Sequence, residues 1–130
     1  MVKWEYEPDE NPKRKHHWDR DHAGFIKRGP NSVGKCPASM SLSDAQALID
    51  DAVPYHPPRW RRSYPQRLYA VSDGVVYRAT PTNPGVSYHG FPEHSEKFPR
   101  DAKAKRVRQQ LLERAKEQGY EREVRRWMNW

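Results

Sequence analysis

The sequence predicts an α+β domain: a small three-stranded antiparallel β-meander packed with one helix on its N-terminal side and two C-terminal helices. Three observations support this class. Two β-rich runs flank an Asp-Gly dipeptide, a third follows a turn rich in proline and glycine, and apolar residues recur at helical spacing before and after these strands. A length of 130 residues suits one domain. We expect residues 1–37 to form an irregular basic arm and residues 38–130 to form this domain.

The first helix is predicted over about residues 42–52. Ser41 is a suitable N-cap, and Asp44 lies three residues further on, which is the spacing of a capping box. Small and aliphatic residues then recur on one helical face, and Pro54 prevents the helix from continuing. Residues 54–66 are rich in proline, so we expect an extended, polyproline-like path there.

The strongest local signal is a β-hairpin. Residues 67–72 and 75–80 flank Asp73-Gly74, a dipeptide typical of two-residue type I′ turns. Such a turn pairs Tyr69 with Arg78. One face of the hairpin is then apolar and predicted to be core, whereas the mixed face is a candidate for a partly exposed working surface. The apolar face carries Leu68, Ala70, Val75, Tyr77 and Ala79, and the mixed face carries Arg67, Tyr69, Val71, Val76, Arg78 and Thr80.

A third strand is predicted over residues 86–91. Its register stays open, because a shift by one residue would exchange the faces of Tyr88 and His89. The rest of the chain has helical periodicity, with Asp101 or Ser95 as the N-cap of a long helix and Gly119 as its C-terminal stop. A second short helix follows over about residues 120–128.

Composition limits what the domain can be. Leu, Ile, Val and Phe together number only 19, about 15% of the chain, so Trp and Tyr must supply much of the core. No stretch is apolar enough to span a membrane, the N-terminus lacks the apolar core of a signal peptide, and the single cysteine excludes an internal disulfide. We expect a cytoplasmic protein without membrane contacts, and leave open its delivery to another cell without a signal peptide.

The formal net charge of +7 is concentrated in two blocks. Residues 59–78 carry a net +4 and residues 99–130 carry +5, whereas residues 36–58 carry −3. Clustered basic residues are typical of a nucleic-acid partner, and we expect RNA; the alternative is a solvated surface. In the first block, arginines alternate with aromatics that stack on bases or, alternatively, cap the core. The candidate contacts are Arg59, Trp60, Arg61, Arg62, Tyr64 and Arg67, together with Arg122, Arg125 and Arg126.

Residue types suited to RNA cleavage gather around the third strand. Cleavage without a metal needs a base for the 2′-hydroxyl, an acid for the leaving oxygen and a cation for the charge on phosphorus. His89 is the candidate base or acid, and Arg78 on the neighbouring strand is the candidate phosphate ligand. The alternative is a strand histidine satisfied by a backbone carbonyl. Tyr88 and Thr80 are the candidate orienting groups, Tyr69 and Thr82 are further hydrogen-bonding candidates, and Lys97 and Arg100 follow nearby.

Two further groups of residues are candidates for chemistry. Three histidines and two aspartates lie within residues 16–22, and His17, Asp21 and His22 are the candidate ligands of a divalent metal. The arginine within this cluster and the basic residues before it favour a charged arm instead, so we expect no metal and no other cofactor. Cys36 follows Lys35, but no histidine stands out as its partner, and a buried structural thiol is the favoured interpretation.

Tyr-Arg-Ala-Thr at residues 77–80 and Ser-Tyr-His-Gly-Phe-Pro at residues 87–92, within a short basic domain, resemble small ribonuclease toxin modules of bacterial competition systems. The resemblance covers residues 67–92. It implies RNA cleavage with His89 and Arg78 at the site, and a cognate inhibitor protein as a partner. The alternatives are a non-catalytic RNA- or DNA-binding protein, and a protein-interaction module such as an adaptor, an inhibitor or a phage accessory protein.

Overall fold

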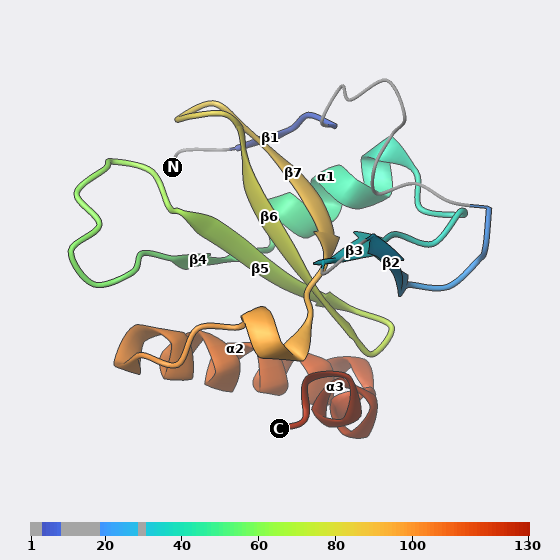
Figure 1. Cartoon of the computed structure of the whole chain (residues 1–130). Helices are drawn as coiled ribbons and strands as arrows, with labels where there is room; N and C mark the ends of the chain where they lie inside the picture. The colour runs from blue at the N-terminus through green and yellow to red at the C-terminus, as the bar shows by residue number, and fades with distance from the viewer. Residues whose placement is uncertain (1–3, 9–18, 29–30) are drawn as a thin grey trace.

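The structure of the chain, a computed structural model, describes residues 4–8, 19–28 and 31–130 (Figure 1). Its main feature is a five-stranded sheet of order β1-β7-β6-β5-β4, beside which β2 and β3 form a separate hairpin. The α+β class is therefore confirmed, and the predicted meander forms the central three strands of a larger sheet. The elements are β1 (Glu5–Tyr6), β2 (Gly24–Arg28), β3 (Asn31–Lys35), α1 (Leu42–Asp50), β4 (Val53–Tyr55), β5 (Arg67–Ser72), β6 (Val75–Asn83), β7 (Ser87–Pro92), the 3-10 helix η1 (Ser95–Lys97), α2 (Ala102–Gln118) and α3 (Glu121–Met128).

The Asp73-Gly74 dipeptide forms the tight turn that the sequence predicts. Both residues have positive φ angles, 50° and 83°, as a type I′ turn requires. Tyr69 pairs with Arg78 across the hairpin, so the predicted register is confirmed. The turn chemistry alone therefore sets which residues of β5 and β6 share a face.

The third strand of the meander settles the register that the sequence left open. β7 pairs antiparallel with β6 and places His89 opposite Thr80. Side chains alternate between the two faces of a strand, so His89 lies on the same face as Arg78, and Tyr88 lies on the opposite face.

Several strands lie outside the meander and correct the expectation of an irregular arm. β1 pairs in parallel with β7, with Glu5 opposite Ser87. β2 and β3 form an antiparallel hairpin within residues 24–35. β4 pairs antiparallel with β5 inside the segment predicted to be polyproline-like, and it tolerates Pro54 because it is an edge strand. The pairing of β1 with β7 joins segments far apart in the sequence, and no local pattern encodes it.

The hairpin of β2 and β3 packs against the rest of the molecule at the end of β7. The ring of Phe25 lies 5.4 Å from the ring of Trp127 and 5.1 Å from that of His94. A Cβ atom at Gly34 would lie 2.7 Å from the carbonyl oxygen of Pro92, so only glycine permits this close approach. Part of the segment 1–37 is thus packed against the same folded unit as the meander.

The helices begin and end largely where the sequence predicts. The Ser41 hydroxyl accepts a 3.0 Å hydrogen bond from the Asp44 amide, and the Asp44 carboxylate accepts one from the Ser41 amide, which completes the capping box. Asp101 caps α2, and Gly119 ends it with a φ of 84°. The first helix stops at Asp50 rather than Ala52, because the chain enters β4. Of the helices that the structure describes, none has the length and apolarity needed to cross a membrane.

The sheet is covered on both faces. On one face, Ile49 of α1 packs with Leu68 and Tyr88. On the other, α2 and α3 bury Tyr69 and Val76 completely, which corrects the expectation that the whole mixed face is partly exposed. The larger core lies between this face and the two C-terminal helices, and it comprises Val53, Tyr55, Tyr69, Val71, Val76, Phe98, Ala104, Val107, Leu111, Ala115, Val124 and Met128.

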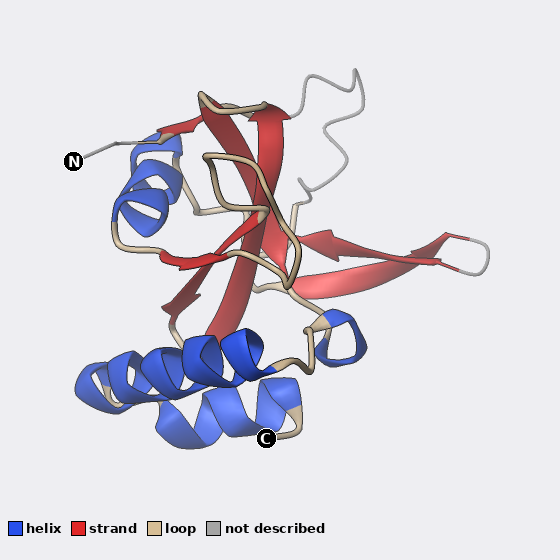
Figure 2. Cartoon of the chain, turned by 90° about the vertical axis from the view of Figure 1, so that its left-hand side faces the viewer, coloured by secondary structure: helices blue, strands red, loops and turns tan. Residues whose placement is uncertain are grey.

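The two C-terminal helices cover only part of that face. Figures 1 and 2 show α3 near the β5–β6 turn, α2 running alongside β4 and β5, and the β6–β7 turn on the side of the sheet away from these helices. Apolar side chains occupy the strands near the β5–β6 turn, and Arg78 and Thr80 follow on β6 toward the other end, both partly exposed. This part of the face, which carries Arg78 and Thr80, is called the polar half of the mixed face. It is the candidate location of a functional site.

The contact between the β5–β6 turn and α3 yields a stability prediction with a matched control. Gly74 and Gly85 both have a φ of 83°, but a Cβ at Gly74 would lie 2.6 Å from the Glu123 Cβ, whereas one at Gly85 would lie 3.7 Å from the Tyr64 ring. We expect Gly85→Ala to lower the free energy of unfolding by about 1 kcal/mol through backbone strain alone. Gly74→Ala should lower it by about 2–4 kcal/mol, because α3 must also shift. Urea denaturation followed by tryptophan fluorescence measures both, and equal losses would contradict the packing of α3 on the turn.

Candidate functional site

The polar half of the mixed face brings together three of the four predicted catalytic residues. Arg78 and Thr80 lie two positions apart on β6 and therefore on one face, and His89 of β7 stands opposite Thr80. Arg78 stands opposite Phe91, and its guanidinium lies over the Phe91 ring at 4.7 Å. His89 and Arg78 are thus diagonal neighbours on adjacent strands, and both side chains are partly exposed.

Two threonine hydroxyls hold the imidazole of His89. The Thr80 Oγ1 lies 3.2 Å from Nε2, and the Thr82 Oγ1 lies 2.8 Å from Nδ1. Thr82 donates its own proton to the carbonyl oxygen of Glu7 at 2.7 Å, so it accepts from Nδ1–H of His89. In the neutral ring Nε2 is then the basic nitrogen, with the Thr80 hydroxyl as its donor. The register irregularity between Pro81 and Asn83 lies at this point, as β-bulges often do beside functional side chains.

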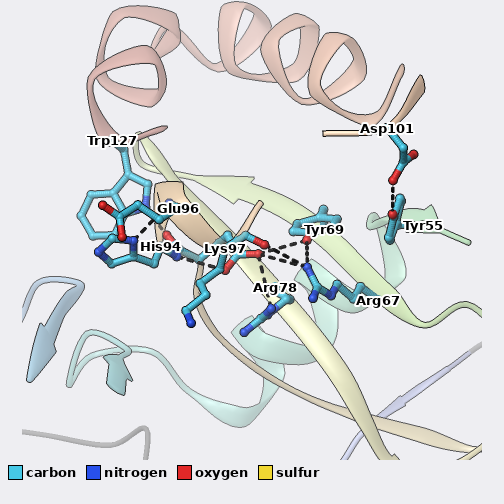
Figure 3. A network of polar contacts seen from close by, with 10 residues as sticks. Tyr55, Arg67, Tyr69, Arg78, His94, Glu96, Lys97, Asp101 and Trp127 are labelled. Atoms are coloured by element: carbon cyan, nitrogen blue, oxygen red, sulfur yellow. Dashed lines mark hydrogen bonds and ion pairs between the residues drawn. The ribbon is translucent and has the colours of Figure 1, made fainter. Parts of the chain in front are cut away.

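A buried carboxylate, that of Glu93, lies within 4 Å of two cations of this face, Arg67 and Arg78, which Figure 3 labels. Glu93 is only 1% exposed, and its Oε2 accepts a 3.0 Å hydrogen bond from the Tyr69 hydroxyl. The same oxygen lies 3.8 Å from the Arg67 Nη1 and 3.7 Å from the Arg78 Nη1. Its other oxygen accepts a 3.0 Å hydrogen bond from the His94 amide. One carboxylate therefore fixes two guanidinium groups that come from neighbouring strands.

Glu93 is not among the residues predicted from the sequence, although the sequence carries a signal for it. His89, Phe91 and Glu93 are spaced by two residues, which places all three on one face of an extended segment. An acidic residue that continues the row of a candidate histidine and faces two arginines is an expected partner for them. The predicted strand ended at residue 91, before this position.

Burial changes the pKa of two groups in this cluster, Arg78 and Tyr69. Burial lowers the pKa of Arg78, and the like charge of Arg67 acts in the same direction, whereas Glu93 opposes both. Burial and the charge of Glu93 raise the pKa of Tyr69 above its usual range, so its hydroxyl keeps its proton and donates. Among the described residues, the buried Nε of Arg78 has no hydrogen-bond partner. With two guanidiniums, those of Arg67 and Arg78, and one carboxylate, that of Glu93, the cluster holds one more cation than anion.

Tyr88, the fourth predicted catalytic residue, lies elsewhere. It is fully buried on the opposite face of the sheet, and its hydroxyl donates a 2.6 Å hydrogen bond to the carbonyl oxygen of Pro65. Its ring also packs edge-on against Trp4 at 5.4 Å. Tyr88 is thus a core residue beneath α1, and its side chain does not reach the face that carries His89.

The predicted nucleic-acid contacts separate into three places. Trp60 donates a 2.6 Å hydrogen bond from Nε1 to the Tyr64 carbonyl oxygen, and the two rings pack edge-on at 5.8 Å, so these aromatics contact each other. The neighbouring Arg59, Arg61 and Arg62 are exposed in the loop before β5. Arg122, Arg125 and Arg126 are exposed on α3, at the other end of β5, a strand length of roughly 17–20 Å away. Of the predicted contacts, Arg67 alone joins the cluster around Glu93.

The remaining candidates carry no site within the described residues. His17 lies outside them, the Asp21 carboxylate accepts a hydrogen bond from the Ser39 amide, and the His22 Nδ1 contacts the Ala23 carbonyl oxygen. No group of three or more possible metal ligands occurs in the part of the chain that the structure describes. Cys36 is partly buried, and its Sγ donates to the Gly90 carbonyl oxygen at 3.8 Å.

Comparisons with known proteins found no matching family model, no matching curated protein and no matching solved structure.

The Glu93 cluster predicts a large loss of stability when the carboxylate is removed. Glu93→Ala leaves two guanidiniums partly buried without their counter-charge, so we expect the free energy of unfolding to fall by about 3–5 kcal/mol. Glu93→Gln keeps the hydrogen-bonding shape and should lose less. Glu117→Ala, which removes an exposed carboxylate on α2, should change stability by less than about 0.5 kcal/mol. Urea denaturation measures all three, and a Glu93→Ala loss as small as that of Glu117→Ala would contradict the role given to Glu93.

The environment of Cys36 predicts an unreactive thiol. Burial raises its pKa from the usual 9.0 to about 11, so the thiolate is scarce at pH 8. We expect the folded protein to react far more slowly with a thiol reagent than the protein unfolded in urea. Because the unfolded thiol ionises first, its contribution to stability falls as the pH rises from 9 to 11. Equal labelling rates in the two states would show that the thiol is accessible.

Proposed function

We propose that this protein is a metal-independent ribonuclease whose site is the polar half of the mixed face. The observation that carries the proposal is the placement of His89, Thr80 and Arg78 side by side on one partly exposed face. The imidazole of His89, a residue type suited to proton transfer, lies next to Arg78, which belongs to a cluster of two guanidiniums and one carboxylate. This pair is what transfer of a proton beside a phosphodiester requires.

The roles of the side chains follow from their contacts. In the reaction the 2′-oxygen forms a bond to phosphorus, the bond from phosphorus to the 5′-oxygen breaks, the 2′-hydroxyl loses a proton and the 5′-oxygen gains one. His89 carries one of these two proton transfers through Nε2, which is the basic nitrogen of the neutral ring, and solvent water carries the other. Arg78 stabilises the charge that develops on the phosphate oxygens. Thr80 and Thr82 orient the imidazole through its two nitrogens.

Two other functions stay proposals. A non-catalytic RNA- or DNA-binding protein would use Arg67 and Arg78 for phosphate contacts without proton transfer. A protein-interaction module would need neither His89 nor nucleic acid. The cognate inhibitor protein that the ribonuclease resemblance implies stays a prediction, and on this proposal it would cover the face that carries His89.

The proposal is tested by incubating the purified protein with a synthetic RNA in the presence of EDTA. We expect cleavage products that end in a 2′,3′-cyclic phosphate, and no cleavage of the 2′-deoxy strand of the same sequence. His89→Ala should reduce the rate by about 100-fold or more, because general acid–base catalysis contributes that much. His22→Ala, which removes an exposed imidazole with a local backbone contact, is the matched control and should leave the rate unchanged.

Thermal melting of both variants shows whether they remain folded. Absence of cleavage by the unsubstituted protein would refute the ribonuclease proposal. Cleavage by His89→Ala at the rate of His22→Ala would remove His89 from the mechanism. RNA binding without cleavage would instead favour the non-catalytic binding protein.

A further inference from the structure

The guanidiniums of Arg67 and Arg78 around Glu93 form a second cluster, beside the site that contains His89. The Nη1 atoms of Arg67 and Arg78 approach the same Glu93 oxygen, at 3.8 and 3.7 Å. Glu93 is 1% exposed, whereas the side chains of Arg67 and Arg78 are 23% and 17% exposed. The carboxylate therefore lies beneath the two guanidiniums, and part of each guanidinium side chain faces solvent.

The guanidinium of Arg67 is held in place before any ligand arrives. Its Nη1 donates to the Tyr69 hydroxyl at 3.0 Å and to the Lys97 carbonyl oxygen at 3.2 Å. A planar guanidinium has five N–H donors, and these contacts involve only one of its nitrogens. Ordering a long side chain in advance reduces the entropy that ligand binding must overcome.

The local charge points to an anionic ligand. Two guanidiniums face one carboxylate (Figure 3). Lys97, whose backbone carbonyl oxygen accepts a hydrogen bond from Arg67, adds an exposed cation to this part of the surface. Glu93 cannot neutralise this set, and it is buried out of reach of a ligand. Forked donors in a cationic setting match the oxygens of a phosphate group better than those of a neutral ligand.

The position of this cluster relative to His89 determines what it can bind. Leu68 pairs with Ala79, so the preceding Arg67 lies beside Thr80, which stands opposite His89. Arg67 and His89 are thus two strands apart, about 10 Å at the usual strand spacing. One phosphate group does not bridge that distance. A ligand that contacts both places is a chain with successive phosphates.

We propose that Arg67 and Lys97, beside Arg78, form a subsite for a phosphate group adjacent to the one that is cleaved. This inference rests on the proposed function, because that function defines which phosphate is cleaved. Binding at the subsite itself does not require cleavage. It assigns the substrate class as a single polynucleotide strand held through at least two phosphates, rather than a small nucleotide. Glu93 and Tyr69 act as positioning residues for Arg67.

The test measures binding of an uncleavable 2′-deoxy oligonucleotide and of inorganic phosphate. Lys97→Ala is compared with Lys116→Ala, which removes the same charge from an exposed position in the last turn of α2. We expect Lys97→Ala to weaken oligonucleotide binding about tenfold and Lys116→Ala to weaken it less than twofold. Phosphate should raise the melting temperature more than chloride at equal ionic strength, and Lys97→Ala should reduce this effect.

Arg67 is tested by a pair of variants because its removal also affects stability. Arg67→Lys keeps the charge but loses the forked donors, and we expect it to lose most of the phosphate effect while remaining folded. Arg67→Ala should in addition reduce the salt dependence of oligonucleotide binding by about one counterion. Equal binding by Lys97→Ala and Lys116→Ala, together with an unchanged phosphate effect in Arg67→Lys, would overturn the subsite.

Failure of this subsite and failure of the ribonuclease proposal give different results. A protein that cleaves RNA while its Lys97→Ala and Lys116→Ala variants bind alike retains the proposed function and loses the subsite. A protein that cleaves no RNA but binds the oligonucleotide through Lys97 and Arg67 retains the subsite and loses the ribonuclease activity. Stabilisation by inorganic phosphate without oligonucleotide binding would show a site for free phosphate and would overturn the polynucleotide assignment.

Discussion

The buried carboxylate of Glu93 is the interaction on which the arrangement of this protein depends. A buried charge is costly unless it is paired, and Glu93 is paired from two neighbouring strands, by Arg67 and Tyr69 of β5 and by Arg78 of β6. Its own backbone carbonyl accepts a 2.9 Å hydrogen bond from the indole of Trp127 in α3. One residue thus joins the sheet, the end of β7 and the C-terminal helix, and it also determines where the cations of the polar face stand.

The two ends of the mixed face have different environments because the same strands carry two kinds of residue. Near the β5–β6 turn, Val71 and Val76 give α2 and α3 an apolar surface to cover. Further along β6, Arg78 and Thr80 offer no such surface, and α3 lies beside the β5–β6 turn instead. The mixed composition of this face therefore reflects a core at one end and a polar cluster at the other, rather than one continuous working surface.

The distribution of charge takes a different meaning in three dimensions. The exposed arginines of the first block, Arg59, Arg61 and Arg62, lie in the loop before β5, whereas α3 with its exposed arginines packs on the β5–β6 turn. These two sets of arginines therefore do not form one continuous surface by themselves. The cations with the most constrained geometry are Arg67 and Arg78, which stand together because β5 and β6 pair in register. A ribonuclease or a nucleic-acid-binding protein would rely on this pair, next to His89, more than on the exposed loop arginines.

Local interactions are what the sequence by itself determined. The Asp73-Gly74 turn, the Ser41 capping box and the Gly119 stop each involve residues a few positions apart, so the hairpin register and most helix ends were predictable. Half of the candidate site followed, since the spacing of residues on β6 places Arg78 and Thr80 on one face. The partners of Glu93, the positions of β1 and β4, and the burial of Tyr88 were decided only by the tertiary structure. These features depend on contacts between residues as much as 80 positions apart. Forming such contacts costs chain entropy, and no local sequence pattern indicates which of them form.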